Sequence, residues 1–331
     1  MVTSLTSALF LHWTTPSPST PTKELSNSEL SLLHNLAQYV HSLAQGKVGS
    51  GFDVSAAVWG SQIYRRFAVG CLGDLLSRPE GAERVTSREL LEVLSPERNP
   101  AWSDEAMKAI VLPFALPPGT ILILADVDAG SNTPSMVSKV LAWKKRAPQQ
   151  ADESWNALKD SNLKLAENFK VLTRLAKRGN VELMGEDAEL DRRTKDEWET
   201  APHFLAATQH IETTRRLMRE MGELSDVPIE PPEQTRLLDA CSSLFDVIGA
   251  GVPGAGGYDA VWVLVKTAVA DSTGPTPAEE VEKLLLGWKE MSVRPLSRDA
   301  WVHGGQEEGK SGLLLERLEL VDGLKAAVDR V

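Results

Sequence analysis

The amino-acid sequence predicts an α+β fold, because short strands and long amphipathic helices are mixed along it without a regular strand–helix–strand repeat. The 331 residues are 42% hydrophobic and 24% charged, which is typical of a soluble globular protein with one large or two ordinary domains. No apolar run approaches the length of a membrane span, so we expect no membrane partner.

Charge and cysteine content narrow the function classes. The net charge of −11 argues against nucleic acid as a partner, so any phosphate site has to be built locally from backbone amides and a few cations. The two cysteines, Cys71 and Cys241, match no metal-binding or redox spacing. We therefore expect a reduced, cytoplasmic setting and no metal-ligating residues.

The predicted helices carry apolar residues at helical spacing and are bounded by glycine, proline or capping residues. In chain order they cover residues 1–13, 28–46, 52–59, 87–94, 133–146, 152–178, 187–221, 234–243, 277–288 and 313–331. The expected apolar stripe of the second helix comprises Leu33, Leu36, Ala37, Val40, Leu43 and Ala44. Its expected C-cap is Gly46. Thr133 before Pro134 is the expected N-cap of the fifth helix, and Gly179 and Gly222 are the expected ends of the two longest.

The predicted strands are short apolar runs bounded by turn residues. They cover residues 62–68, 120–126, 244–250, 259–265 and 291–296. The second of them, Thr-Ile-Leu-Ile-Leu-Ala-Asp, is typical of a buried strand, and a glycine-rich turn at 252–258 joins the third to the fourth. Residues 14–21 are expected to be a loop, and 77–118 are expected to be irregular apart from one helix.

The segment 45–57 holds three glycines, Lys47, Ser50 and Asp53 between two predicted helices. Glycine lets the backbone approach a ligand closely, and a helix that begins after Gly51 directs unpaired amides toward the same space. Asp53 would then project from the first helical turn. The spacing fits a phosphate-binding loop and a tight turn between packed helices equally well. The Gly-Lys-Ser/Thr ending of a P-loop is absent.

A second candidate anion site is the start of the helix at 133–146. Hydroxyl groups at Ser131, Thr133 and Ser135 cluster there, and helix amides favour anions. Capping and turn formation explain the same hydroxyl groups without a ligand.

Five segments together resemble one known family. They are residues 34–38, 45–54, 64–67, 229–235 and 253–260, which read His-Asn-Leu-Ala-Gln, Gln-Gly-Lys-Val-Gly-Ser-Gly-Phe-Asp-Val, Tyr-Arg-Arg-Phe, Ile-Glu-Pro-Pro-Glu-Gln-Thr and Pro-Gly-Ala-Gly-Gly-Tyr-Asp-Ala. In this order they resemble the phosphomevalonate kinases of the fungal type, within the GHMP small-molecule kinase superfamily. The resemblance covers roughly residues 1–302 and is highly specific.

The resemblance implies a two-domain α+β GHMP kinase fold with the site in the cleft between the domains. Residues 1–119 would be the remainder of the N-terminal, ribosomal-protein-S5-like domain, and 120–302 the central helices and the C-terminal, ferredoxin-like domain. Residues 303–331 would be a polar linker and a tail helix. The family's Pro-x-x-x-Gly-Leu-Gly-Ser-Ser-Ala loop, which wraps the ATP phosphates, is not found. The N-terminal domain is therefore expected to be incomplete, with an exposed apolar patch or sheet edge near residues 1–13.

The activity implied by the resemblance is ATP- and Mg²⁺-dependent phosphorylation of 5-phosphomevalonate to 5-diphosphomevalonate, a step toward isoprenoids and sterols such as ergosterol. Asp53 matches the superfamily's active-site aspartate. The residues matched to the substrate or to the transferred phosphate are Lys47, Ser50, Gly51, Arg65, Ser131, Thr133 and Lys139. The residues matched to the ATP-phosphate loop are Gly254, Ala255, Gly256 and Gly257.

Two chemical arguments refine these roles. The nucleophile is a phosphate monoester with a second pKa of about 6, so it is largely deprotonated at neutral pH and needs no strong base. We expect Asp53 to act by positioning, by pairing with a metal or cation, or by relaying a residual proton. Arg65 and Arg66 alternate on the predicted strand, so at most one of them faces the site.

Two other interpretations stand beside phosphomevalonate kinase. Absence of the ATP loop favours a non-catalytic homologue that binds phosphomevalonate or a partner protein. Mevalonate kinase and diphosphomevalonate decarboxylase are relatives, but Gly-Ser-Gly-Phe-Asp and Tyr-Arg-Arg-Phe fit the phosphomevalonate enzymes better.

Overall fold

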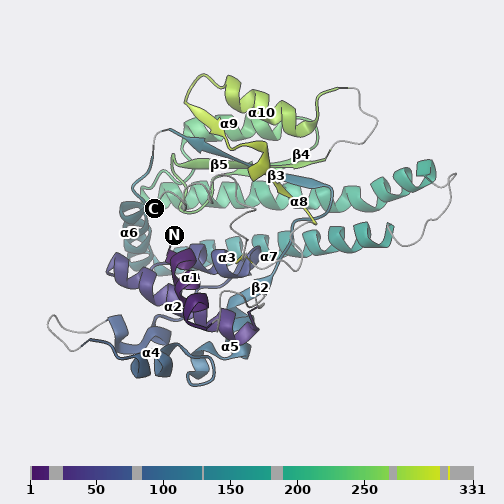
Figure 1. The fold of residues 1–331 in the computed structure, drawn as a ribbon. Helices are drawn as coiled ribbons and strands as arrows, with labels where there is room; N and C mark the ends of the chain where they lie inside the picture. The colour runs from purple at the N-terminus through teal and green to yellow at the C-terminus, as the bar shows by residue number, and fades with distance from the viewer. Residues whose placement is uncertain are drawn as a thin grey trace, which may run out of the picture. The chain divides into compact units, whose positions relative to one another are not determined.

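The computed structural model describes residues 2–14, 25–76, 84–128, 130–179, 189–267, 274–305 and 312–313. The chain forms two compact units, one built from residues 1–115 and 307–331 and the other from 116–306 (Figure 1). The predicted three-part division at 119 and 302 stays a prediction.

The first unit is mainly helical. Its elements are α1 (Val2–Thr14), α2 (Asn27–Gln45), α3 (Phe52–Trp59), β1 (Gln62–Tyr64), a 3₁₀ segment (Val69–Leu76), α4 (Ser87–Leu94), a second 3₁₀ segment (Pro100–Trp102), α5 (Asp104–Ile110) and β2 (Val111–Pro113). Strands β1 and β2 pair antiparallel, with Ile63 opposite Leu112. Helices α1, α2 and α3 pack against one another, and Trp102 is fully buried in the core beside them.

Several sequence predictions for this unit need correction. Strand β1 ends at Tyr64 rather than at residue 68, because its partner strand β2 begins only at Val111, directly after helix α5. The segment 77–118 contains α5 and β2, which were not expected. The apolar stripe of α2 is correct at Leu33, but Val40 and Leu43 are exposed. The face of α2 that packs inward is partly polar instead.

The second unit consists of a sheet and the helices that cover it. Its elements are β3 (Thr120–Val127), α6 (Thr133–Arg146), α7 (Pro148–Gly179), α8 (Glu189–Ser225), α9 (Pro232–Ser242), β4 (Val247–Gly251), β5 (Ala260–Lys266), α10 (Pro277–Gly287), β6 (Val293–Pro295), a 3₁₀ turn (Arg298–Ala300) and β7 (Val302–His303). The strand and helix positions largely confirm those predicted from the apolar spacing.

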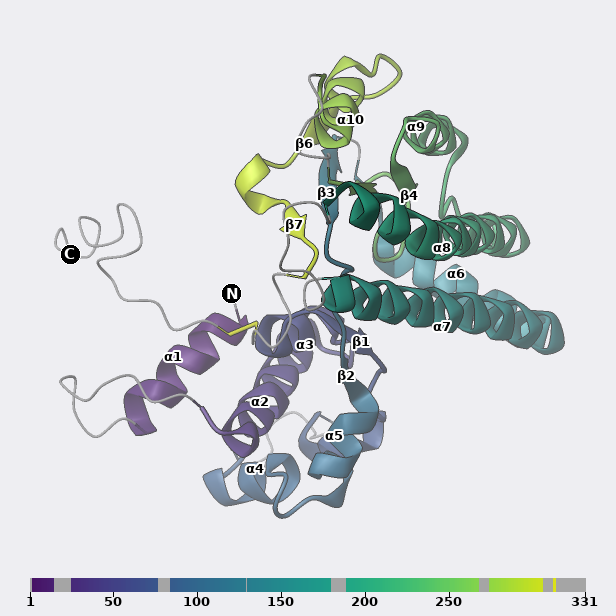
Figure 2. The same ribbon diagram turned by 90° about the vertical axis from the view of Figure 1, so that its right-hand side faces the viewer.

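The described residues of this unit form a five-stranded antiparallel sheet with the order β4-β5-β3-β6, and β7 also pairs with β3. This order, with helices inserted after β3 and after β5, is the ferredoxin-like arrangement that the resemblance implied. Helices α9 and α10 cover one face and α8 covers the other, with α7 alongside α8 (Figure 2). Strand residues therefore alternate between two apolar layers, and Gly249 gives Ile211 of α8 room to approach.

Two helix boundaries differ from prediction for local reasons. The N-cap of α6 is Asn132, whose side chain accepts a hydrogen bond from the Ser135 amide, so Thr133 is already inside the helix. Helix α8 continues past Gly222 to Ser225. The chain then turns back, and the Val227 carbonyl lies where a Cβ on residue 222 would be, so this glycine serves close packing instead of ending the helix. The predicted tail helix at 313–331 lies almost entirely outside the described residues.

Candidate functional site

The loop that carries Asp53 is held through its carbonyl groups. Tyr64 donates to the Ser50 carbonyl (2.8 Å), Arg66 to the Val48 carbonyl (3.0 Å) and Gln38 to the Gly51 carbonyl (2.7 Å). The N–H and C=O groups of a trans peptide point in opposite directions. The amides of residues 49, 51 and 52 therefore point away from the three donors, which leaves them available to an anion at the start of α3.

A buried polar chain supports this loop. Gln38 lies 3.2 Å from His34, the His34 ring lies 3.0 Å from Asn35, and Asn35 donates to the Leu94 carbonyl. All three side chains are at most 1% exposed. Burial lowers the pKa of His34 to about 4, so the ring is neutral at neutral pH. Gly51 has φ +73°, and a Cβ there would overlap the Gln38 amide, so only glycine fits.

Asp53 lies in the first turn of α3 with its side chain about half exposed. Its carboxylate is 3.4 Å from the His41 ring. Lys47 and Ser50 are exposed on the same loop. Arg65 and Arg66 are both exposed and lie beyond the end of β1, so the predicted alternation along a strand does not apply to them. Arg66 contacts the loop through the Val48 carbonyl.

The glycine turn at 252–258 in the second unit is packed backbone against backbone. The Gly257 amide donates to the Ile229 carbonyl (2.7 Å), and the Tyr258 amide donates to the Ser131 hydroxyl (2.6 Å). Gly254, Gly256 and Gly257 all have positive φ. A Cβ at 256 would overlap the Ile229 carbonyl, and one at 257 would overlap Ser131. The structure thus joins Ser131 to the predicted phosphate loop.

The segment 229–235 supports this turn through hydrogen bonds. The fully buried Gln234 donates from its side chain to the Gly257 carbonyl (2.7 Å), and Glu233 accepts from the Tyr258 hydroxyl (3.1 Å). Thr235 donates to the Pro231 carbonyl and so fixes the start of α9. The sequence motif Ile-Glu-Pro-Pro-Glu-Gln-Thr is therefore a support for the glycine turn.

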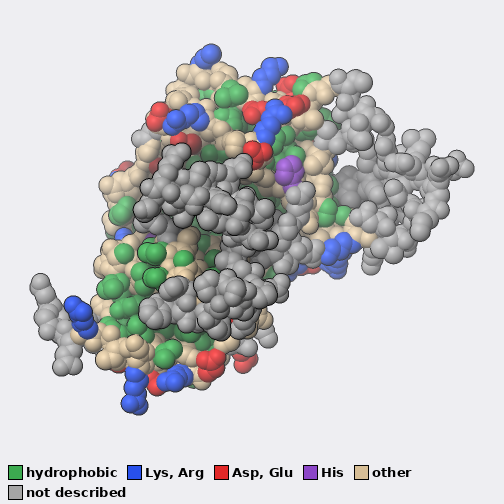
Figure 3. Space-filling view, viewed as in Figure 1, with side chains coloured by type: hydrophobic (Ala, Val, Ile, Leu, Met, Phe, Trp, Pro, Cys, Tyr) green, Lys and Arg blue, Asp and Glu red, His purple; other side chains and the backbone are tan. Residues whose placement is uncertain are grey.

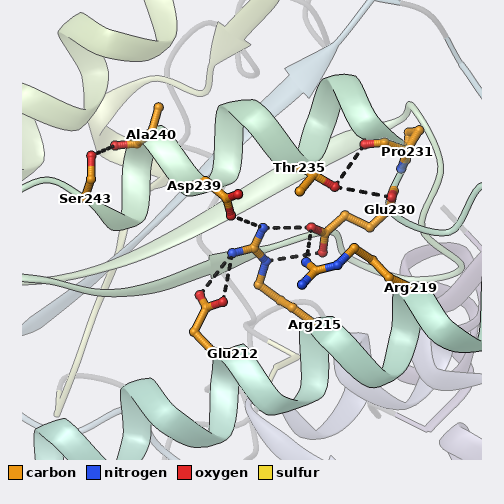
Figure 4. Close-up of polar contacts among 9 residues, drawn as sticks. All are labelled: Glu212, Arg215, Arg219, Glu230, Pro231, Thr235, Asp239, Ala240 and Ser243. Atoms are coloured by element: carbon orange, nitrogen blue, oxygen red, sulfur yellow. Dashed lines mark hydrogen bonds and ion pairs between the residues drawn. The ribbon is translucent and has the colours of Figure 1, made fainter.

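Glu230 in the same segment is the centre of a buried charge network (Figure 4). Arg215 of α8 contacts both oxygens of the Glu230 carboxylate, at 2.7 and 3.2 Å, and Arg219 contacts it at 2.7 Å. Arg215 also binds Glu212 and Asp239. Burial by itself would lower the pKa of Arg215, but the surrounding carboxylates outweigh it and raise that pKa above the ordinary arginine value.

Lys139 and Thr133 occupy other positions on α6. Lys139 pairs with Asp226 at 2.8 Å, on the edge of a groove of about 700 Å³. Proline residues of the segment 227–232 and Arg219 also line the groove. Thr133 is exposed at the start of the helix. Roles for both residues toward the substrate stay predictions.

Sequence reasoning assigned no role to Gln38, Glu230, Gln234 or Arg215. The first three lie inside the motifs that carried the family resemblance, so the motif itself was the available signal. Arg215 gave no signal, because its charge on a long amphipathic helix is typical of a solvated residue.

The described part of the chain contains neither a metal-binding cluster nor a membrane-spanning helix. Within it, no three or more His, Cys, Asp or Glu side chains are grouped so that they could hold a metal ion. Among the same residues, no helix combines the length and the apolar character that crossing a membrane requires.

Comparison with known proteins agrees with this architecture. Residues 204–283 match the family model described as GHMP kinases C terminal. A protein from Listeria innocua, Lin0012, has a similar fold, with a TM-score of 0.51 and 16% identity over 92% of this chain and 64% of its own. Residues 204–283 therefore resemble the C-terminal domain of GHMP kinases, and the likeness to Lin0012 is one of fold.

The more specific relationship comes from sequence. The chain is 41% identical over 270 residues to phosphomevalonate kinase erg8 of Aspergillus fumigatus, covering 80% of this chain and 49% of that protein. It is 39% identical over 309 residues to the peroxisomal phosphomevalonate kinase of Arabidopsis thaliana, covering 89% and 57%. Over the matched 80–89% of its own length, the chain is a homologue of these phosphomevalonate kinases. It spans about half the length of the curated relatives that it matches.

Proposed function

We propose that this chain carries the catalytic function of a phosphomevalonate kinase, the ATP-dependent conversion of (R)-5-phosphomevalonate to (R)-5-diphosphomevalonate in isoprenoid and sterol synthesis. An oxygen of the substrate's phosphate attacks the γ-phosphorus of ATP, and the bond from that phosphorus to the ADP oxygen breaks. The homology to phosphomevalonate kinases is the observation that carries this proposal. The cytoplasmic location stays a prediction, and one of the relatives is named as peroxisomal.

The Asp53 loop and the glycine turn would bind different phosphate groups. Phosphoryl transfer depends on positioning and on neutralising charge. The outward amides at the start of α3 and the exposed Lys47 suit the substrate or the transferred phosphate. In the glycine turn the amides of residues 256–258 are used internally. Contacts with ATP phosphates would come from Gly254 and Ala255 at its tip.

Mg²⁺ fits this arrangement as an ion shared between protein and nucleotide. It is usually bound by one or two carboxylates together with substrate phosphates. The half-exposed Asp53 carboxylate can provide such a ligand. When bound, the ion would supply charge neutralisation on the transferred phosphate.

The test is an ATP-consumption assay with 5-phosphomevalonate and Mg²⁺. It compares the 331-residue chain with the same chain fused behind the N-terminal half of the Aspergillus fumigatus relative. Turnover by either form supports the proposal. Calorimetric binding of 5-phosphomevalonate without turnover in both forms would replace it with the alternative function, a non-catalytic binding protein. Absence of both binding and turnover would overturn it.

A further inference from the structure

We propose that Glu230 is a positioning residue that fixes the glycine turn on helix α8 through Arg215 and Arg219, an inference that rests on the proposed function for its catalytic consequence. Its side chain is 1% exposed and receives three hydrogen bonds from the two guanidinium groups. Glu230 directly follows Ile229, whose carbonyl accepts the Gly257 amide.

The glycine turn is attached to residue 229, so the two move together. The contact involves the backbone of both segments, and the Ile229 carbonyl fills the space that a side chain at Gly256 would need. Gln234 adds a second attachment through the Gly257 carbonyl. A displacement of Glu230 is therefore passed directly to the turn.

The geometry that this charge network fixes matters more than its net contribution to the stability of the protein. Burying charges costs solvation energy, and replacement of such a pair by apolar residues is often neutral or stabilising. A paired, doubly hydrogen-bonded carboxylate nevertheless fixes a single geometry. Arg215 meets Glu230 side-on through two bonds, and Arg219 meets the same carboxylate from the next turn of α8 (Figure 4). Two fixed points on one rigid helix thus determine where residue 230 lies.

The catalytic consequence is a loss of turnover more than of substrate affinity. A displacement of a catalytic group by about 1 Å lowers the rate by up to about 100-fold. Glu230→Gln keeps the shape and removes the charge. We expect a kcat at least about tenfold lower, with KM for ATP and 5-phosphomevalonate within about threefold of the parent protein. The matched control is Glu290→Gln, because Glu290 pairs with Arg236 on the surface and does not touch the turn.

A double variant separates positioning from stability. Arg215→Met with Glu230→Met replaces the ion pair by apolar side chains and should recover the free energy of unfolding, measured in urea. A low kcat in this stable variant supports the positioning role. Recovery of kcat together with stability would overturn it.

Hydrogen exchange provides a readout that needs no turnover. In Glu230→Gln, the amides of the peptide spanning the turn at 253–258 should exchange at least about tenfold faster than in the parent or in Glu290→Gln. Unchanged exchange in Glu230→Gln would overturn the inference. If the parent chain proves inactive, the proposed function fails, while the exchange result still decides whether Glu230 positions the turn.

Discussion

At the scale of single residues, the glycines of the 252–258 turn are required for different reasons. Gly254 has φ +65° with no atom near its missing Cβ, so only backbone strain opposes a side chain there. Gly256 has φ +77° and lies directly on the Ile229 carbonyl. A side chain at position 256 would therefore meet both backbone strain and a close contact with a fixed backbone carbonyl.

This difference predicts the effect of alanine at the two positions. Gly254→Ala should lower the free energy of unfolding by roughly 1 kcal/mol, the cost of a left-handed non-glycine residue. Gly256→Ala should cost about 2 kcal/mol or more, because the Ile229 carbonyl has to move as well. Urea unfolding of both variants measures the difference. Equal losses would show that the close contact with Ile229 contributes nothing.

Asp53 provides a prediction about chemistry. Asp53→Asn should lower kcat by about 10- to 100-fold, less than loss of a strong general base costs, because the substrate phosphate is already largely ionised. The assay uses whichever form of the chain turns over. Glu92→Gln, which affects a half-exposed surface ion pair, is the control. An Asp53→Asn enzyme of near-full activity would remove Asp53 from the proposed mechanism.

At the scale of elements, helix α1 buries hydroxyl side chains and exposes apolar ones. Thr3, Thr6 and Ser7 are buried, whereas Leu5 and Leu9 are 62% and 53% exposed. On neighbouring helices Val40, Leu43 and Phe52 are also exposed. Figure 3 shows hydrophobic side chains gathered over the part of the first unit that contains α1 and α2. This agrees with the apolar patch expected near residues 1–13.

An exposed apolar face of this kind promotes self-association. Replacing Leu5 and Leu9 together by serine should reduce the fraction of oligomer or aggregate, with little change in the free energy of unfolding. Light scattering after size-exclusion chromatography measures the first quantity and urea unfolding the second. The buried Leu33 is the contrast, because Leu33→Ala should cost about 2–5 kcal/mol. A monodisperse parent protein would contradict the prediction.

At the scale of the whole molecule, the two units have separate cores. In the first unit, Trp102 and Leu72 belong to a helical core. In the second, Ile123 and Val263 belong to the sheet core beneath α9 and α10. A change in solution conditions can therefore affect one unit more than the other.

The buried His34 predicts such a difference under mild acid. The unfolded chain takes up a proton at His34 near pH 6.5, and the folded unit does so only near pH 4. Between these values the unfolded state binds more protons, so this contribution to stability is present above pH 6.5 and is lost as the pH falls toward 4. The first unit should lose about 2 kcal/mol between pH 7 and pH 5 from this residue.

Hydrogen exchange of each unit at pH 7 and pH 5, corrected for intrinsic rates, measures this loss. His34→Gln should be less stable at pH 7 but should lose less on acidification. His210→Gln in the second unit controls for histidine substitution as such. An equal pH dependence of the first unit in the parent protein and in His34→Gln would exclude His34 as the cause.

Much of the fold followed from local sequence. Helix α3 and strand β3 lie where apolar spacing, glycine and proline placed them, because these signals act within a few residues. The glycine-rich segment at 45–57 was a candidate phosphate loop for the same reason, and 252–258 was a predicted turn that the family resemblance matched to a phosphate loop. The glycines at 51, 254, 256 and 257 have left-handed backbone conformations. Glycine adopts these conformations without strain, so its presence in the sequence already indicated them.

Other features depended on contacts between distant residues. Arg66, which lies beyond the end of β1, donates to the Val48 carbonyl of the Asp53 loop. Glu230, Gln234 and Arg215 acquire their roles only when α8, α9 and the glycine turn are packed together. A charge on an amphipathic helix has the same local pattern whether it is solvated or buried. Sequence alone therefore determined most of the elements and the resemblance to phosphomevalonate kinases, and tertiary packing decided which side chains hold the two loops in place.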